Sequence, residues 1–348
     1  MRGSGRTRGR AARLVTALAI AAAAALALAA PAGAANYRVI DLGTLGGATS
    51  AANDINESGA VVGWAKTASG RVHAVIWRDG HKTDIGTLGG PNSAATGISD
   101  NFAVVGTSGV PGGGRHGFLW RANTGAPHNL GPPAPVRIAD TGAMIGNTRL
   151  PNDEPVGVYR SFQVAGGWKQ LLTAGWDGSI AADIDDAGEA VGTLITEPHG
   201  SAPFTYQNGV LTILPSVPTA AETSANAINN VGQIAGQTFD PLGIVLWDGG
   251  HWNPIATPAL VDPEVHDMND CAQIVGAHHP VEFFKPAAFL ISGGVGVDLN
   301  SQIPAASGWH LGVATAINDA GQIVGIGRHH GVQRAFLLQP TTAAGGCS

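Results

Sequence analysis

Two pairs of adjacent histidines, His278-His279 and His329-His330, are the residues of this sequence best suited to hold a metal ion. Imidazoles presented by neighbouring loops can bind zinc or copper. His73, His116 and His199 recur at comparable places, each near the start of an expected strand. This recurrence favours a repeated structural role. We therefore assign no metal ligand, and weak metal binding by the paired histidines stays open as the alternative.

An acidic run from Asp183 to Glu189 resembles the start of a calcium loop. Such a loop needs oxygen ligands at alternate positions and a distant bidentate acid. Ala187 stands at one of those positions, and other parts of the chain repeat the same segment with Val231 or Ala320 there. We therefore predict a hairpin turn rather than a calcium site.

Linear signs of catalysis are missing from the sequence. It contains no G-x-S-x-G, no H-E-x-x-H and no phosphate-binding loop that leads into a helix. The remaining acids look scattered, mostly at turns, with no evident general acid/base pair. We assign no catalytic residue, no cofactor-binding residue and no cofactor.

Cys271 and Cys347 are the two cysteines of the chain. Two cysteines cannot make a disulfide-dense scaffold, so a hydrophobic core must hold the fold. The expected strand directions place both residues on the same face of the molecule. A disulfide formed outside the cell and two free thiols are both compatible with the sequence.

These residues are positioned by a pattern that recurs seven times: Ile-(Asn/Asp/Ser)-x-x-Gly-x-hydrophobic-hydrophobic-Gly. A closing glycine follows each first aliphatic residue, here called the anchor, by eight positions, and neighbouring anchors are 40 to 49 residues apart. A fixed period of this length indicates a repeat architecture. The anchors are Ile55, Ile98, Ile138, Ile184, Ile228, Met268 and Ile317.

Each repeat carries four strand signals. A short strand of small residues ends at the anchor, a turn follows, and then come a Val-Val type strand, an aromatic strand such as Ala74–Trp77, and a fourth strand after a further turn. Asn and Gly suit the first turn, although Phe102 and Ala272 replace its glycine in two repeats and Ala139 replaces its asparagine in a third. We expect the anchors and the aromatic residues, such as Ile55 and Trp77, to be buried. Four strands in 40 to 45 residues is the period of a β-propeller blade.

The ends of the chain complete one repeat. The segment from Tyr37 to Gly43 matches a fourth strand, whereas the last repeat stops after its third strand, Ala335–Leu338. We therefore predict an all-β, seven-bladed β-propeller with four antiparallel strands per blade, whose last blade is closed by the N-terminal strand. Closure removes open sheet edges.

Residues 1–34 are predicted to be a signal peptide. Five arginines precede an apolar run from Leu14 to Ala30, and Ala32-Gly33-Ala34 offers a cleavage site before Ala35. A retained transmembrane anchor is the alternative. The propeller then spans residues 35–340, and residues 341–348 form a short tail. All 25 acids but only 14 of the 19 basic residues follow residue 34, which gives a net charge of −11. This acidity argues against binding to nucleic acid or to anionic membranes.

The repeats resemble the HAF repeat family of bacterial extracellular proteins. The resemblance lies in Gly43–Gly47 and Gly86–Gly90, which both read GTLGG, and in the triplets His73-Ala74-Val75 and His116-Gly117-Phe118. Ala335-Phe336 keeps two letters of the triplet. The resemblance covers essentially the whole mature chain and implies secretion or exposure at the cell surface. It carries no known catalytic residue. Because no sorting segment follows Gly345 to Ser348, free secretion is expected.

We expect a secreted, monomeric, non-enzymatic binding or structural module whose loops contact an extracellular protein, glycan or surface ligand, without nucleic acid and without a membrane once the signal is cleaved. The alternative is an extracellular hydrolase or lyase that degrades a polymer. Acids, His or Arg that converge in a deep funnel would favour the enzyme, and flat or aromatic loops would favour binding.

Overall fold

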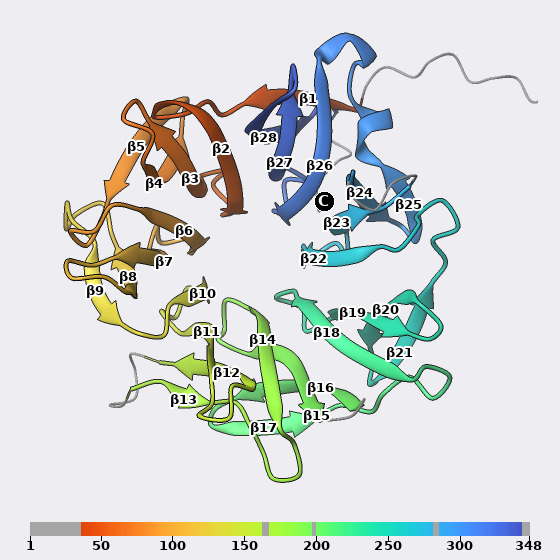
Figure 1. Cartoon of the computed structure of the whole chain (residues 1–348). Helices are drawn as coiled ribbons and strands as arrows, with labels where there is room; N and C mark the ends of the chain where they lie inside the picture. The colour runs from red at the N-terminus through yellow and green to blue at the C-terminus, as the bar shows by residue number, and fades with distance from the viewer. Residues whose placement is uncertain (1–35, 162–166, 197–199, 281–284, 343–348) are drawn as a thin grey trace, which may run out of the picture. The chain divides into compact units, whose positions relative to one another are not determined.

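Seven four-stranded antiparallel sheets surround a central axis, as Figure 1 shows. The structure is a computed structural model that describes residues 36–161, 167–196, 200–280 and 285–342. The described residues belong to one compact unit. This arrangement confirms the predicted seven-bladed β-propeller. The described residues include no helix that is both long enough and apolar enough to cross a membrane.

In the first three blades the strands follow chain order from the axis outward. Blade 1 contains β2 (Gly46–Ile55), β3 (Val61–Thr67), β4 (Val72–Arg78) and β5 (His81–Gly86). Blade 2 contains β6 (Ser93–Ile98), β7 (Val104–Gly109), β8 (Arg115–Trp120) and β9 (His128–Gly131). Blade 3 contains β10 (Pro135–Ile138), β11 (Met144–Arg149), β12 (Pro155–Arg160) and β13 (Lys169–Gln170).

The next three blades keep the same order. Blade 4 contains β14 (Gly178–Ile184), β15 (Ala190–Thr196), β16 (Gly200–Gln207) and β17 (Val210–Ile213). Blade 5 contains β18 (Glu222–Ile228), β19 (Ile234–Phe239), β20 (Gly243–Asp248) and β21 (His251–Ile255). Blade 6 contains β22 (Glu264–Met268), β23 (Ile274–His278), β24 (Ala287–Ser292) and β25 (Val295–Asp298), and the 3-10 turns η1 (Leu299–Gln302) and η2 (Ala305–Ser307) follow it.

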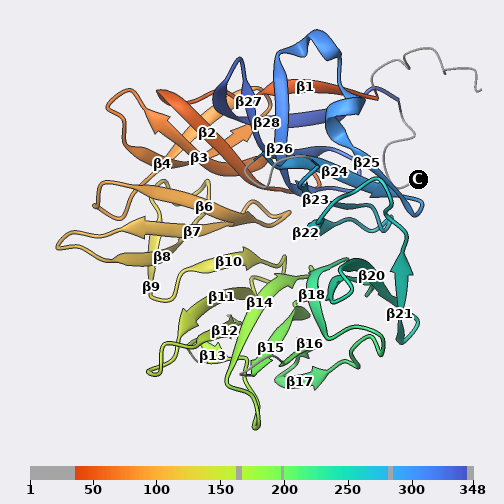
Figure 2. The same ribbon diagram turned by 45° about the vertical axis from the view of Figure 1, so that its right-hand side comes forward.

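Blade 7 is assembled from both ends of the described chain. It contains β26 (Trp309–Ile317), β27 (Ile323–His329), β28 (Val332–Pro340) and, as its outermost strand, β1 (Tyr37–Asp41). Figure 2 shows β1 beside β28 from a second direction. Val39 lies opposite Leu338 in this antiparallel pair, and the backbone N–H of Leu42 donates to the carbonyl of Ala335 at 3.1 Å. The predicted closing strand and its partner are therefore confirmed.

The turn after each anchor keeps its shape even where its glycine is replaced. Phe102 and Ala272 both adopt positive φ, 61° and 54°, the conformation for which glycine is usually chosen. The closing glycine has a different cause. A Cβ at Gly63 would collide with the backbone carbonyl of Ala51 on the neighbouring strand, and a Cβ at Gly325 would collide with that of Val313. The repeat pattern therefore reflects two requirements: a tight turn after the anchor, and a close approach of neighbouring backbones at the closing glycine.

The hydrophobic core is divided into layers between successive blades. In the layer between blades 1 and 2, Ile76 packs with Ile98, Phe118 and Trp120. All seven anchors are buried, and Trp77 is 4% exposed. The expected burial of anchors and aromatic residues is confirmed for these positions. Because every blade packs on two neighbours, the layers set where each turn emerges at the axis.

Candidate functional site

Acidic side chains converge at the axis on one face of the ring, which we call the turn face because it carries the turns between the first and second strands of each blade. At five of the seven seams, among the described residues, a backbone N–H of one turn donates to the carboxylate of the next turn. Glu57 donates to Asp100 at 2.8 Å, and Asp319 donates back to Glu57 at 3.0 Å. Six blades supply an acid and blade 5 supplies an amide at this position: Glu57, Asp100, Asp140, Asp186, Asn230, Asp270 and Asp319.

One residue before each anchor, a second set of side chains lies along the axis. The carboxylates of Asp54, Asp183 and Asp267 each accept a hydrogen bond of 2.8 to 3.0 Å from the anchor N–H of the following blade. Arg137 is the one basic residue among the described residues that line this channel, and its Nε lies 3.6 Å from Oδ1 of Asp183. The channel therefore holds three carboxyl groups and one guanidinium below the ring of turn acids.

Burial raises the pKa of several of these acids. Burial, followed by the charges of neighbouring acids, raises the pKa of Glu57 to about 7 and that of Asp186 to about 6. Burial also raises the pKa of Asp183 to about 6 and that of Asp267 well above its usual range. The channel therefore holds groups that exchange protons near neutral pH.

Three turn acids are close enough to share a ligand. Carboxylate oxygens of Asp100, Asp140 and Asp186 lie within 4.8 Å of one another, the one such group among the His, Cys, Asp and Glu side chains of the described chain. Oxygen donors of this kind suit a hard divalent cation. The hydrogen bonds between blades explain why these carboxylates lie close together, with no need for a bound ion. The channel at the axis has a volume of only about 110 Å³. This volume is below that of typical small-molecule sites.

The sequence predicted acids at turns with no evident general acid/base pair, and the structure brings the turn acids together in one ring. The acids are far apart in the sequence, but they occupy the same place in successive repeats, two residues after the anchor. Superposing the repeats would have revealed the ring. The sequence reading treated each acid as an isolated turn residue.

The asparagine that follows several anchors joins neighbouring blades. Its side chain donates to a backbone carbonyl of the next blade at 3.1 to 3.2 Å, from Asn56, Asn229, Asn269 and Asn318. Blades 2, 3 and 4 carry Ser99, Ala139 and Asp185 instead. Within the described residues, the seam between blades 3 and 4 lacks both this bond and the bond between turn acid and backbone.

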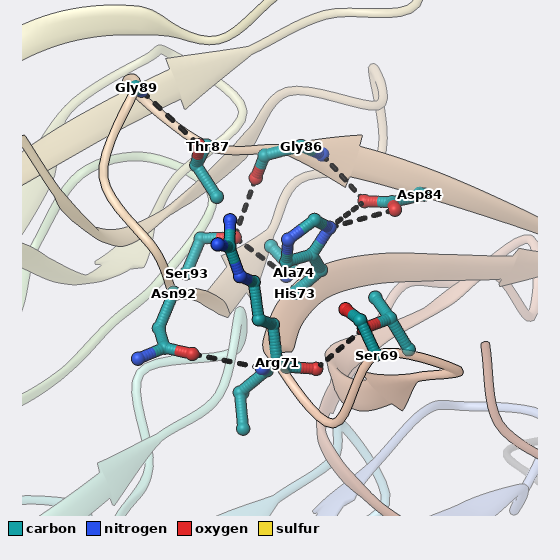
Figure 3. Close-up of polar contacts among 12 residues, drawn as sticks. Ser69, Arg71, His73, Ala74, Asp84, Gly86, Thr87, Gly89, Asn92 and Ser93 are labelled. Carbon is teal, nitrogen blue, oxygen red and sulfur yellow. Dashed lines mark hydrogen bonds and ion pairs between the residues drawn. The ribbon is translucent and has the colours of Figure 1, made fainter. Parts of the chain in front are cut away.

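The residues that carry the resemblance to HAF repeats form a contact between blades 1 and 2 (Figure 3). Nδ1 of His73 lies 2.8 Å from Oδ2 of Asp84, and Oδ1 of Asp84 accepts from the N–H of Gly86 at 2.8 Å. The hydroxyl of Ser93 accepts from the N–H of Ala74 at 2.8 Å and also contacts the Gly86 carbonyl. The same arrangement recurs with Asp41, Gly43 and Ser50, and partly with His116, Asn129 and Gly131. These motif residues therefore hold blades together.

A groove opens on the turn face between blades 3 and 4. At four other seams this position holds an apolar pair from the third strands, such as Ile76 with Trp120 and Leu290 with Leu338, whereas Arg160 and Thr205 take part in the pairs at the two remaining seams. At this seam the corresponding pair is Tyr159 and Tyr206, whose ring centroids are 4.8 Å apart. The groove has a volume of about 630 Å³. We call it the seam groove, and its lining includes Thr141, Tyr159, Lys169, Ala187, Tyr206 and Gln207.

Contacts unique to this seam hold the groove open at a fixed width. The hydroxyl of Tyr159 donates to the carbonyl of Gly188 at 3.3 Å. The ammonium of Lys169 donates to the carbonyl of Gly209 at 3.2 Å and lies 5.3 Å from the ring centroid of Tyr206. Sequence reasoning missed the groove. Its signal was the loss of repeat residues at Ala139 together with tyrosine in place of an aliphatic residue at position 159.

Three of the paired histidines lie beside different carboxylates, and the ring of His330 lies 4.4 Å from that of His329. Nε2 of His278 lies 3.6 Å from Asp298, and Nε2 of His279 lies 3.7 Å from Glu264. The ring of His329 stacks on Trp309 at 4.7 Å, and its Nδ1 lies 3.2 Å from Asp41. No histidine belongs to the three-acid group described above. His199 lies outside the described residues.

The other sequence predictions have separate outcomes. The run from Asp183 to Glu189 forms the end of β14 and the turn to β15, where Oδ1 of Asp185 accepts from the N–H of Glu189 at 2.7 Å, as the prediction of a hairpin turn requires. Cys271 lies in the turn between β22 and β23. Cys347, Ala34 and Ala35 lie outside the described residues, so the disulfide and the cleavage site stay predictions.

Comparisons with known proteins show what this chain resembles in fold. No protein-family model matches the sequence, and no curated protein matches it. Among solved structures, the β-propeller domain of the Trilobed protease from Pyrococcus furiosus is 10% identical with a TM-score of 0.56, covering 84% of this chain and 98% of that chain. YCF48 bound to D1 peptide is 12% identical with a TM-score of 0.55, covering 88% of this chain and 96% of that chain.

A third structure is matched over a smaller part. TolB from Acinetobacter baumannii is 14% identical with a TM-score of 0.48, and the match covers 68% of this chain and 62% of that chain. The chain thus spans less than two thirds of the TolB length. At these identities the likeness concerns the fold, and this chain is a β-propeller.

Proposed function

We propose that this protein is a secreted, non-enzymatic binding module of the HAF repeat family that holds an extracellular ligand in the seam groove. The observation that carries the proposal is the replacement of sealing residues at one seam. Among the described residues this seam alone lacks the bond between successive turns, and it also has Ala139 in place of the asparagine that joins blades and Tyr159 facing Tyr206 across the groove. A structural ring needs no such exception, whereas a ligand site does.

The remainder of the ring supports this role by keeping the groove rigid. Backbone and side-chain hydrogen bonds run between successive turns around the axis and close from blade 7 to blade 1. A preformed groove binds with less loss of conformational freedom than a flexible loop.

One observation favours a hydrolase or lyase as the second candidate. The convergent turn acids, with the pKa of Glu57 near 7 and that of Asp186 near 6, have the proton affinities that general acid/base catalysis uses. The small volume of the axial channel and the structural hydrogen bonds of these carboxylates place this candidate behind the binding module.

A retention assay on immobilised extracellular polysaccharides and peptides tests the proposal, with product release followed by chromatography. Ala187→Trp fills the seam groove from an exposed turn, and Ala320→Trp makes the same change at the equivalent turn of blade 7. We expect retention without product release, lost in Ala187→Trp and kept in Ala320→Trp. Product release that disappears in Asp186→Asn would instead establish the enzyme.

A further inference from the structure

We propose that the ligand of the seam groove is a neutral glycan, an inference that rests on the binding function proposed above. The lining of the groove carries the argument. None of its thirteen described residues is Leu, Ile, Val, Met or Phe. Protein partners are recognised mainly through apolar and aromatic anchors that fill desolvated pockets. Among the described lining residues only Ala143 and Ala187 are aliphatic, so the described lining offers little aliphatic surface to such an anchor.

The groove is instead rich in hydroxyl and amide groups beside aromatic rings. These groups belong to Thr141, Ser161, Gln207, Asn208 and the two tyrosines. Gln207 and Asn208 are exposed at the rim, and Tyr159 is half-buried. A pyranose presents many hydroxyls around its edge and an apolar C–H face, so it can use hydroxyl, amide and aromatic surfaces together.

The charges in and beside the seam groove favour a neutral ligand. Lys169 is the one charged residue in the described lining, and its ammonium already bonds to the carbonyl of Gly209. At the inner end, Thr141 and Ala187 follow Asp140 and Asp186 directly in the turns. These acids would repel a uronate or a sulfated sugar. The volume of about 630 Å³ lies in the range of small-ligand sites and suits a short oligosaccharide segment.

Parallel arrays of neutral oligosaccharides, acidic oligosaccharides and peptides test the inference on the full secreted protein. We expect binding to neutral oligosaccharides that changes little between low and high salt. Ala187→Trp should weaken it at least tenfold, and Gln207→Ala severalfold, while Ala320→Trp leaves it unchanged. Thermal melting of each variant shows that the fold is kept.

The outcomes separate the two proposals. Peptide binding that Ala187→Trp abolishes, without glycan binding, would overturn the glycan class and leave the binding function standing. Salt-sensitive binding to acidic oligosaccharides alone would overturn the neutral class. Binding that is equal in wild type and Ala187→Trp, or none on any array, would overturn both.

Discussion

The side-chain amide of Asn318 donates a hydrogen bond of 3.1 Å to the backbone carbonyl of Asn56, 262 residues earlier in the chain. The Oδ1 of Asn318 accepts from the N–H of Gln322 at 3.0 Å and so shapes its own turn. Asn318 is 1% exposed. One buried side chain thus fixes a local turn and joins the last repeat to the first.

Replacing Asn318 should therefore weaken the whole ring. Asn318→Ala removes the bond that joins blade 7 to the carbonyl of Asn56, which keeps its bond from the N–H of Gly59. It also removes the partner of the Gln322 N–H, and an unsatisfied buried group costs about 1–3 kcal/mol. We expect the free energy of unfolding, measured by denaturant titration, to fall by about 2–4 kcal/mol. Asn253→Ala is the control, because Asn253 is exposed and both of its hydrogen bonds are 3.4 Å long. Equal effects of the two substitutions would contradict this role.

Removal of β1 tests closure at the rim of the ring. Deletion of residues 36–42 exposes the edge of β28 and removes Tyr37, which is 5% exposed and part of the core between blades 6 and 7. The loss of one buried aromatic residue alone costs about 3–5 kcal/mol. We expect a loss of at least this size in thermal or denaturant unfolding. An unchanged melting temperature would refute the closure.

The sequence alone was enough to predict the features that depend on local geometry, which are the strands and turns of each blade. Gly63 is required by the backbone of the neighbouring strand, and Ile55 by burial, so both recur at fixed spacing and reveal the blade. The pairing of Val39 with Leu338 followed because the missing strand of one repeat matched the surplus strand at the other end.

The site depends on relationships between repeats that no single repeat displays. Glu57 and Asp319 each look like an ordinary turn residue, and only ring closure brings them together. Tyr159 is visible as a departure from the pattern, but its effect depends on Tyr206 in the next blade and on Ala139 beneath them. For the same reason the rotamers of His278 and His329 could not be inferred, and these two histidines face separate carboxylates.

Blade 2 has Asn129 at the position that Asp84 occupies in blade 1, and this difference suggests a test of the contact between blades 1 and 2. Asp84 holds the N–H of Gly86, and in blade 2 Asn129 does the same for Gly131 at 2.8 Å. Asp84→Asn should therefore change stability little, whereas Asp84→Ala should lower the free energy of unfolding by about 1–2 kcal/mol. Denaturant titration distinguishes the two. A cost for Asp84→Asn as large as for Asp84→Ala would show that the charge beside His73 matters more than the turn.

A bridge between Cys271 and Cys347, which the sequence leaves open beside two free thiols, has a direct chemical test. Alkylation of the unreduced secreted protein, followed by mass spectrometry, should leave both thiols unmodified, and alkylation after reduction should label both. A disulfide would link the C-terminal tail to the turn of blade 6 and reduce the number of conformations open to the unfolded chain. Complete labelling without reduction would exclude the bridge.

The turn acids predict that stability falls as pH rises through neutrality. The folded-state pKa of Glu57 is about 7 and that of Asp186 about 6, both above the value of about 4 expected in the unfolded chain. The folded state therefore binds more protons between about pH 4 and 7, and each deprotonation in this window costs stability. Burial lowers the pKa of His266 and His278, which opposes the trend wherever the unfolded histidines, with a pKa of about 6.5, are still partly protonated. We expect a higher melting temperature at pH 6.5 than at pH 8. Glu57→Gln should reduce this difference and Glu154→Gln should not, and a melting temperature that rises toward pH 8 would contradict the account.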